Sequence, residues 1–257
     1  MSGTKFKYFI LFTVFIAVTD AAVWHIGSSF PYVMREGPLA YAQSPVLFPD
    51  TLSVASVWSP VYREFGIQEG MVYIGARGFD LSLKTQYHSL MSNHQLSFGF
   101  PILNETTLQA GLQLHYTLSA LHGIETQHKG SCSGGLKITP HPDWGISLYS
   151  MHFLSFPRDS TEHLLEANSG CAFAYSLLPE LKLSLVFQKR VLLPWQMFLG
   201  VQYKPWKVLA CAIQFEIGEH QWEIELNICP GRWVVQAVVR HHPFLGFSQQ
   251  YVIAYVY

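Results

Sequence analysis

The residues best suited to chemistry are carboxylates and lysines near the end of the chain. Glu216, Glu223 and Glu225 lie on segments predicted to be neighbouring strands. Lys204 and Lys207 are close to them in the sequence. Inside a narrow passage such a cluster could form a polar constriction that selects solutes. The same charges could instead pair only to satisfy one another when buried, and the sequence leaves both interpretations open.

Serine beside histidine is a second possible source of chemistry, because that pair could support hydrolysis. Ser97 and Ser147 each lie in a strand-like segment, and the chain has 12 histidines. It has no Gly-x-Ser-x-Gly element and no phosphate-binding glycine loop. The pair His241-His242 falls at a predicted turn, and the histidine spacings match no pattern of metal ligands. We expect no catalytic residue, no cofactor and no metal site.

Composition narrows the fold class. Charged residues make up 13% of the chain and aromatic residues 15%, whereas soluble domains carry about 25% charged residues. The net charge of −1 and the scattered lysines and arginines argue against a nucleic-acid partner. Beyond residue 22 no apolar run approaches the ~20 residues of a spanning helix. A membrane β-barrel and a soluble β-protein with a large core remain.

Alternation of apolar and polar residues predicts the elements that position these side chains. It runs without a break over Leu108–Leu118, and a strand needs ~9–11 residues to cross a bilayer. Other alternating segments are 79–88, 95–100, 181–188, 195–204, 209–217 and 221–228, with less regular ones near 144–154, 165–176 and 232–241. Several turns are short enough to force antiparallel neighbours, and longer connections occur near 119–131 and 155–164. We expect an all-β antiparallel barrel of about 12 strands, with 10 to 14 allowed.

The polar side of each alternation would line the lumen of such a barrel, or face water in a soluble sandwich. The predicted lumen-lining residues are Asp80, Lys84, Gln109, Gln113, Lys182, Gln202, Lys204, Glu216, Glu223 and Glu225. Aromatic residues at segment ends suit the girdles of a membrane barrel. These residues are Tyr87, Tyr116, Trp195, Tyr203, Trp206, Trp222 and Trp233.

The two ends of the chain also favour the membrane barrel. Residues 1–22 have the pattern of a cleavable secretory signal, with an uncleaved anchor or a buried helix as the alternative. Residues 23–70 contain five prolines and alternate weakly, so we expect an irregular segment that plugs the barrel or leads into it; the barrel would be 71–257. The last residues place aromatic and apolar side chains on one strand face, as in a barrel-closing strand. These side chains are Tyr251, Ile253, Tyr255 and Tyr257.

The four cysteines match no CxxC metal pattern. They could pair after export, or remain free thiols that face lipid as small apolar groups. These residues are Cys132, Cys171, Cys211 and Cys229.

Residues 71–257 resemble the FadL-like outer-membrane barrels, and among them the shorter PorV/PorQ-type proteins. The resemblance lies in Leu96–Ile102 with Leu108–Tyr116, in Gly134–Pro140, and in the closing hairpin Val234–Gly246. It implies an outer-membrane location and passage of hydrophobic molecules or service to a secretion apparatus. The family's Asn-Pro-Ala element is replaced here by Trp58-Ser59-Pro60.

The expected function is therefore non-enzymatic passage of small or hydrophobic molecules across the outer membrane. The alternatives are a secretion-associated or structural barrel that binds partner proteins, an outer-membrane hydrolase, and a soluble exported β-protein. Outer-membrane lipid, the barrel-assembly machinery and secretion-system proteins are the partners that the first two possibilities imply.

Overall fold

The computed structural model describes residues 44–45, 47–61, 66–76, 78–121, 126–156, 167–190, 194–218, 220–243 and 246–257. The segment predicted as a signal, 1–22, lies outside these residues. No helix among the described residues is long and apolar enough to cross a membrane.

Every regular element in these residues is a strand, and there are 14. They are β1 (Ser53–Val61), β2 (Ile67–Ala76), β3 (Phe79–His88), β4 (Met91–Asn104), β5 (Leu108–Leu121), β6 (Thr126–His141), β7 (Trp144–Phe156), β8 (Asn168–Leu178), β9 (Leu181–Arg190), β10 (Trp195–Trp206), β11 (Leu209–Ile217), β12 (Trp222–Ile228), β13 (Trp233–His242) and β14 (Gly246–Val256).

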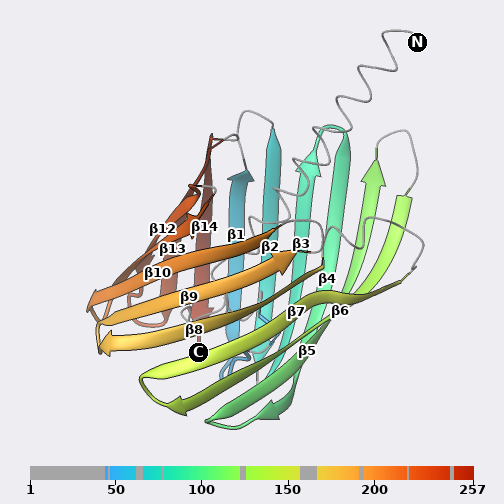
Figure 1. Cartoon of the computed structure of the whole chain (residues 1–257). Coiled ribbons are helices and arrows are strands. Elements are labelled where there is room, and N and C mark those ends of the chain that lie inside the picture. Colours follow the sequence, from blue (N-terminus) through green and yellow to red (C-terminus); the bar gives the residue numbers. More distant parts are fainter. Residues whose placement is uncertain are drawn as a thin grey trace.

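The strands close into a barrel in which each pairs antiparallel with its neighbours in sequence, and β1 pairs with β14 (Figure 1). Six residue pairs join these two strands, from Ser53 opposite Val256 to Trp58 opposite Tyr251. The amide of Tyr257 also donates a hydrogen bond of 2.8 Å to the carbonyl of Leu52. A closed ring leaves no exposed strand edge, which removes the usual route to edge-to-edge aggregation.

The predicted all-β antiparallel barrel is confirmed, but the strand number is 14 rather than about 12. The additional strands are β1, which lies wholly in the range 23–70 that was expected to be irregular, and β2, which begins in that range. The barrel therefore begins at Ser53, and the boundary at residue 71 was wrong. Pro60 lies beyond Trp58, the last β1 residue paired with β14, so it has a paired strand only on the β2 side, and a proline is tolerated at such an edge. In β2 the inward side chains Met71 and Tyr73 are apolar, so the stretch from residue 71 to 74 is apolar on both faces and its alternation is hidden.

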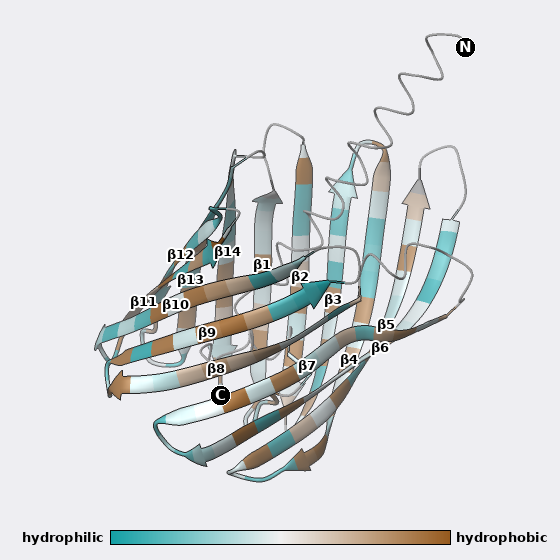
Figure 2. Cartoon of the chain, viewed as in Figure 1, coloured by the Kyte–Doolittle hydropathy of each residue, from teal (hydrophilic) through white to brown (hydrophobic). Residues whose placement is uncertain are grey.

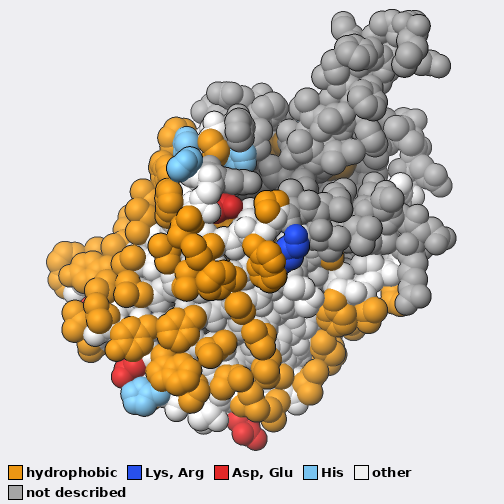
Figure 3. Space-filling model, in the orientation of Figure 1, with side chains coloured by type: hydrophobic (Ala, Val, Ile, Leu, Met, Phe, Trp, Pro, Cys, Tyr) orange, Lys and Arg blue, Asp and Glu red, His pale blue; other side chains and the backbone are white. Residues whose placement is uncertain are grey.

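The outward face of the barrel is apolar and the inward face is mostly polar. Within β2, outward Val72 is 57% exposed, whereas inward Tyr73 is 0% exposed. The hydropathy colours alternate along most strands in the same way (Figure 2), and hydrophobic side chains cover much of the surface seen in Figure 3. Soluble monomers rarely expose apolar patches above a few hundred Å², so this surface fits a hydrocarbon surrounding rather than water.

The connections differ in length between the two ends of the barrel. At the end that holds the C-terminus, here called the turn end, they are short: 77–78, 105–107, 142–143, 179–180, 207–208 and 229–232. At the opposite end, here called the loop end, the longest connection is 157–167. Short turns at one end and longer loops at the other are typical of outer-membrane barrels.

Outward aromatic side chains gather near both ends, as predicted for membrane-interface girdles. Those toward the turn end are Phe79, Tyr175, Tyr203, Trp206, Trp233 and Tyr257, and those toward the loop end are Trp58, Tyr87, Tyr116, Trp195, Trp222 and Phe247. Some pack across neighbouring strands: Trp58 stacks on Tyr251 with ring centroids 5.7 Å apart, which ties the first strand to the last.

A charged substitution tests whether the outward face meets lipid. Leu199 is outward and near the middle of β10, whereas outward Trp206 ends that strand at the turn end. We expect Leu199→Arg to lower the free energy of unfolding in lipid vesicles by about 2–4 kcal/mol, and Trp206→Arg by about 1 kcal/mol or less from its charge, because the cost depends on depth. Denaturant unfolding, followed by the heat-dependent gel shift of an intact barrel, measures both. Equal effects at the two depths would contradict a membrane-embedded wall.

Candidate functional site

The lumen wall is the candidate site, and the structure places most of the predicted residues there. Asp80, Gln113, Glu216, Glu223 and Glu225 are buried on the inward face. Lys84, Gln109, Lys182 and Gln202 are half-buried at inward positions of their strands. Lys204 is exposed at the turn end of β10, where the register with β11 shifts between Tyr203 and Trp206.

An ion pair between Glu223 and Arg240 is a charged contact of the wall. The two residues are directly opposite on β12 and β13, and the Arg240 Nε atom donates to the Glu223 carboxylate. Arg240 also donates to the side-chain oxygen of Gln250 on β14, at 3.2 Å. Lys204 and Lys207, which were expected to cluster with these carboxylates, are instead exposed near the turn end. Arg240 was overlooked although it continues the inward alternation of Gln236 and Val238.

Hydrogen-bonded side chains continue this charged wall on both sides. The Gln196 amide donates to Glu216 at 2.8 Å, between β10 and β11. The Tyr149 hydroxyl donates to Gln188 at 3.1 Å, from β7 toward β9. We call the inward residues that make these contacts the polar belt: Tyr149, Gln188, Gln196, Glu216, Glu223, Arg240 and Gln250. It holds carboxylate, guanidinium and amide groups over the β7–β14 side of the lumen.

Glu69 on β2 is a further inward carboxylate, and it falls in the range expected to be irregular. It is 1% exposed, and the positive charges of Lys84 and Arg240 act on it. Neither carboxylate oxygen has a hydrogen-bond partner among the described residues. Lys84 of β3 and Arg240 of β13 are thus the basic groups whose charge reaches this buried carboxylate.

A second inward group joins histidine and serine side chains of β4–β7. His115 lies between two hydroxyls, with its Nδ1 atom 2.8 Å from Ser97 Oγ and its Nε2 atom 2.8 Å from Ser133 Oγ. Ser131 Oγ lies 2.7 Å from the Nδ1 atom of His152, whose ring centroid is 4.8 Å from that of His115. His152 adopts a left-handed backbone (φ 52°) where the register of β6 and β7 shifts.

This group differs from a hydrolytic triad. The structure does bring Ser97 to a histidine, as the hydrolase alternative required. Both ring nitrogens of His115 are engaged by hydroxyls, however, whereas a triad uses one of them to bond the carboxylate that orients the base. Ser147 is fully buried, and its hydroxyl has no hydrogen-bond partner among the described residues. Among the residues that the structure describes, no group of three His, Cys, Asp or Glu side chains is placed to bind a metal ion.

The chain leading into β1 lies inside the lumen near the turn end. A Cβ atom added to inward Gly111 would lie 2.4 Å from the ring of Phe48, and one added to Gly75 would lie 2.6 Å from Pro49. The carbonyl of Pro49 accepts a hydrogen bond of 2.8 Å from the Gly78 amide. Glycines in the wall therefore make the space that residues 47–49 occupy.

All four cysteines are free thiols. Cys132, Cys171 and Cys211 occupy outward positions of β6, β8 and β11, whereas Cys229 lies in the turn after β12. The first three cysteines therefore match one of the two expectations from the sequence, which was that they remain free thiols and face lipid as small apolar groups.

No protein-family model and no curated protein matches the chain. Solved structures do: the outer membrane protein Omp33 of Acinetobacter baumannii aligns with a TM-score of 0.53 at 6% identity, covering 81% of this chain and 98% of that one. A triple-mutant porin of Rhodopseudomonas blastica aligns more loosely, with a TM-score of 0.43 at 7% identity, covering 80% and 99%. The similarity to Omp33 shows that the chain shares the fold of an outer-membrane β-barrel.

The polar belt predicts a specific energetic coupling. Glu223→Ala leaves the Arg240 guanidinium without its carboxylate, and we expect a loss of about 2–3 kcal/mol in the free energy of unfolding. Glu223→Ala combined with Arg240→Ala should cost less than the sum of the single changes, because no uncompensated charge remains. Denaturant unfolding of all four proteins measures the coupling. Additive effects would show that the two side chains do not stabilise each other.

Proposed function

We propose that this chain is an outer-membrane barrel through which small polar solutes pass without catalysis. One observation supports this most directly: the closed wall is apolar outside, while its lumen face holds the polar belt and Glu69. A solute that enters such a lumen can exchange hydrogen bonds with water for hydrogen bonds with the wall.

The polar belt favours polar solutes over the hydrophobic ones that the FadL-like resemblance implies. The inward apolar residues form compact clusters that other side chains cover. Those of β1, β2 and β14 are at most 4% exposed: Ala55, Val57, Met71, Tyr73, Val252 and Ala254. Most side chains of the polar belt are buried as well, so the preference rests on their chemistry. Carboxylate, guanidinium and amide groups can exchange hydrogen bonds with a solute, whereas these apolar side chains cannot.

The proposal includes export by the signal pattern at 1–22 and insertion by the barrel-assembly machinery. Lipid of the outer membrane is then the main partner of the apolar outer face. A role in secretion remains the alternative drawn from the PorV/PorQ-type resemblance.

Reconstitution tests the proposal directly. The purified barrel, verified by its heat-dependent gel shift, is placed in planar bilayers and in liposomes loaded with small sugars. We expect discrete ionic conductance and solute release that heat-denatured protein does not give. An intact barrel that neither conducts nor releases solute would overturn the proposal.

Ion preference should depend on the carboxylates of β11 and β12. Glu216→Gln with Glu225→Gln removes two buried negative charges while keeping side-chain size. The reversal potential under a salt gradient should then shift toward anions, because cations lose favourable charge in the lumen. Lys207→Gln, in the exposed turn after β10, is the matched control and should leave the reversal potential unchanged. An unchanged reversal potential in the double variant would show that these carboxylates do not lie along the path of the ions.

The segment before β1 should narrow the passage. Phe48 lies over Gly111 inside the lumen, so we propose that it forms part of a plug. Phe48→Ala should increase single-channel conductance, because the ring no longer fills that space. Phe79→Ala, which removes an outward ring from β3, should leave conductance unchanged. Equal conductance of Phe48→Ala and the parent protein would contradict a plug at this position.

A further inference from the structure

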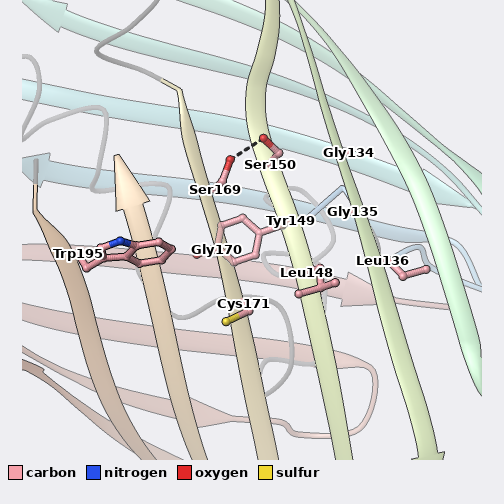
Figure 4. Close-up of a pocket in the computed structure, with 10 residues that line it drawn as sticks. All are labelled: Gly134, Gly135, Leu136, Leu148, Tyr149, Ser150, Ser169, Gly170, Cys171 and Trp195. Carbon is pink, nitrogen blue, oxygen red and sulfur yellow. Dashed lines mark hydrogen bonds between the residues drawn. The ribbon is translucent and has the colours of Figure 1, made fainter. Parts of the chain in front are cut away.

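A groove on the outer face of the barrel is lined by residues of β6, β7, β8 and β10. Its volume is about 520 Å³, and almost all of its lining is apolar. Figure 4 shows Leu136 and Leu148 on one side, Cys171 below, and the Trp195 ring reaching toward Gly170. A volume of this size corresponds to on the order of 15 groups as large as a water molecule, and a methylene group is of similar size.

Small residues create the groove. Gly134, Ser150 and Ser169 occupy outward positions on β6, β7 and β8, and the next outward positions toward the turn end hold Leu136, Leu148 and Cys171. Their register partners are aligned, with Gly134 opposite Ser150 and Ser150 opposite Ser169. The wall is therefore thin over three adjacent strands.

One edge of the groove is polar. Ser150 and Ser169 are joined by a hydrogen bond of 2.7 Å between their hydroxyls (Figure 4). That bond uses one of the two hydroxyl hydrogens, so the pair can still donate outward. Lys189 is directly opposite Ser169, and Trp195 is directly opposite Lys189. One outward row across β7–β10 thus presents hydroxyl, ammonium and indole groups.

This polar row lies on the loop-end side of the apolar part of the groove. Ser169, Lys189 and Trp195 are within one residue of the loop ends of β8, β9 and β10. Leu148 and Cys171 lie two positions nearer the turn end on their strands. An interfacial lysine with a tryptophan beside it suits the level of lipid headgroups, and the apolar groove then extends toward the hydrocarbon.

We propose that this groove holds one acylated lipid with a phosphate-bearing, anionic headgroup. Its chain lies between Leu148 and the Trp195 ring, and its phosphate accepts hydrogen bonds from Lys189 and from the Ser150–Ser169 pair. Charge complementarity favours this occupant, because the basic residue Lys189 is the register neighbour of both Ser169 and Trp195, which line the groove. The inference relies on the proposed membrane location but not on passage through the lumen.

Native mass spectrometry tests the proposal on the intact barrel in detergent, with phosphatidylglycerol or zwitterionic phosphatidylcholine added. We expect one retained phosphatidylglycerol per wild-type barrel and weaker retention of phosphatidylcholine. Lys189→Gln should weaken retention of phosphatidylglycerol about tenfold, as expected for loss of a charge-assisted hydrogen bond. Ser169→Phe fills the groove and should abolish retention.

Matched controls separate the groove from the rest of the outer surface. Ser56→Phe places the same ring on the outward face of β1, and Lys207→Gln removes a lysine from the turn after β10; both should retain phosphatidylglycerol normally. If Ser169→Phe does not insert, Cys171→Phe fills the same groove. Each variant must also keep the heat-dependent gel shift of an intact barrel, and its conductance is measured separately, so that failure of the channel and failure of the lipid site are distinguished. Equal retention by groove variants and controls, or of the two lipids, would overturn the proposal.

Discussion

The pairing of β1 with β14 is the interaction on which the rest of the structure depends. It joins residues about 200 positions apart, as in the pair Ser53 and Val256, and it supplies partners for backbone groups that would otherwise form two open edges. An unsatisfied backbone group in hydrocarbon costs several kcal/mol, so an open sheet could not remain in a bilayer. Once the ring closes, each side chain must face either the lumen or the surroundings.

Closure of the barrel places the outward and inward side chains in different surroundings. Outward leucines, valines and aromatics need no partner in lipid, whereas inward charges must find one another within the ring. Glu223 meets Arg240 across β12 and β13, and the Gln196 amide satisfies Glu216. The same contacts that stabilise these groups also set the chemistry that a solute would meet, so stability and selectivity are inseparable in this wall.

Small residues have opposite uses on the two faces. Inside, Gly75 and Gly111 let the chain before β1 lie against the wall. Outside, Gly134, Ser150 and Ser169 thin the wall and open a groove toward the membrane. Neither use is visible in the local sequence, because a glycine in a strand shows only that a side chain is absent and not what takes its place.

The sequence by itself determined which side chains face outward and which face the lumen. Where apolar and polar residues alternate clearly, as in Leu108–Leu118 and Asp80–Lys84, the period of two places each side chain on the correct face. The period of two did not reveal β1, where the inward residues are small, or β2, where inward Met71 and Tyr73 make the stretch 71–74 apolar on both faces. Only the tertiary structure decided which polar groups meet. Cross-strand register makes Arg240, and not Lys204, the partner of Glu223. It also places Trp195 at the rim of the outer groove. Alternation carries no information on the register between distant strands.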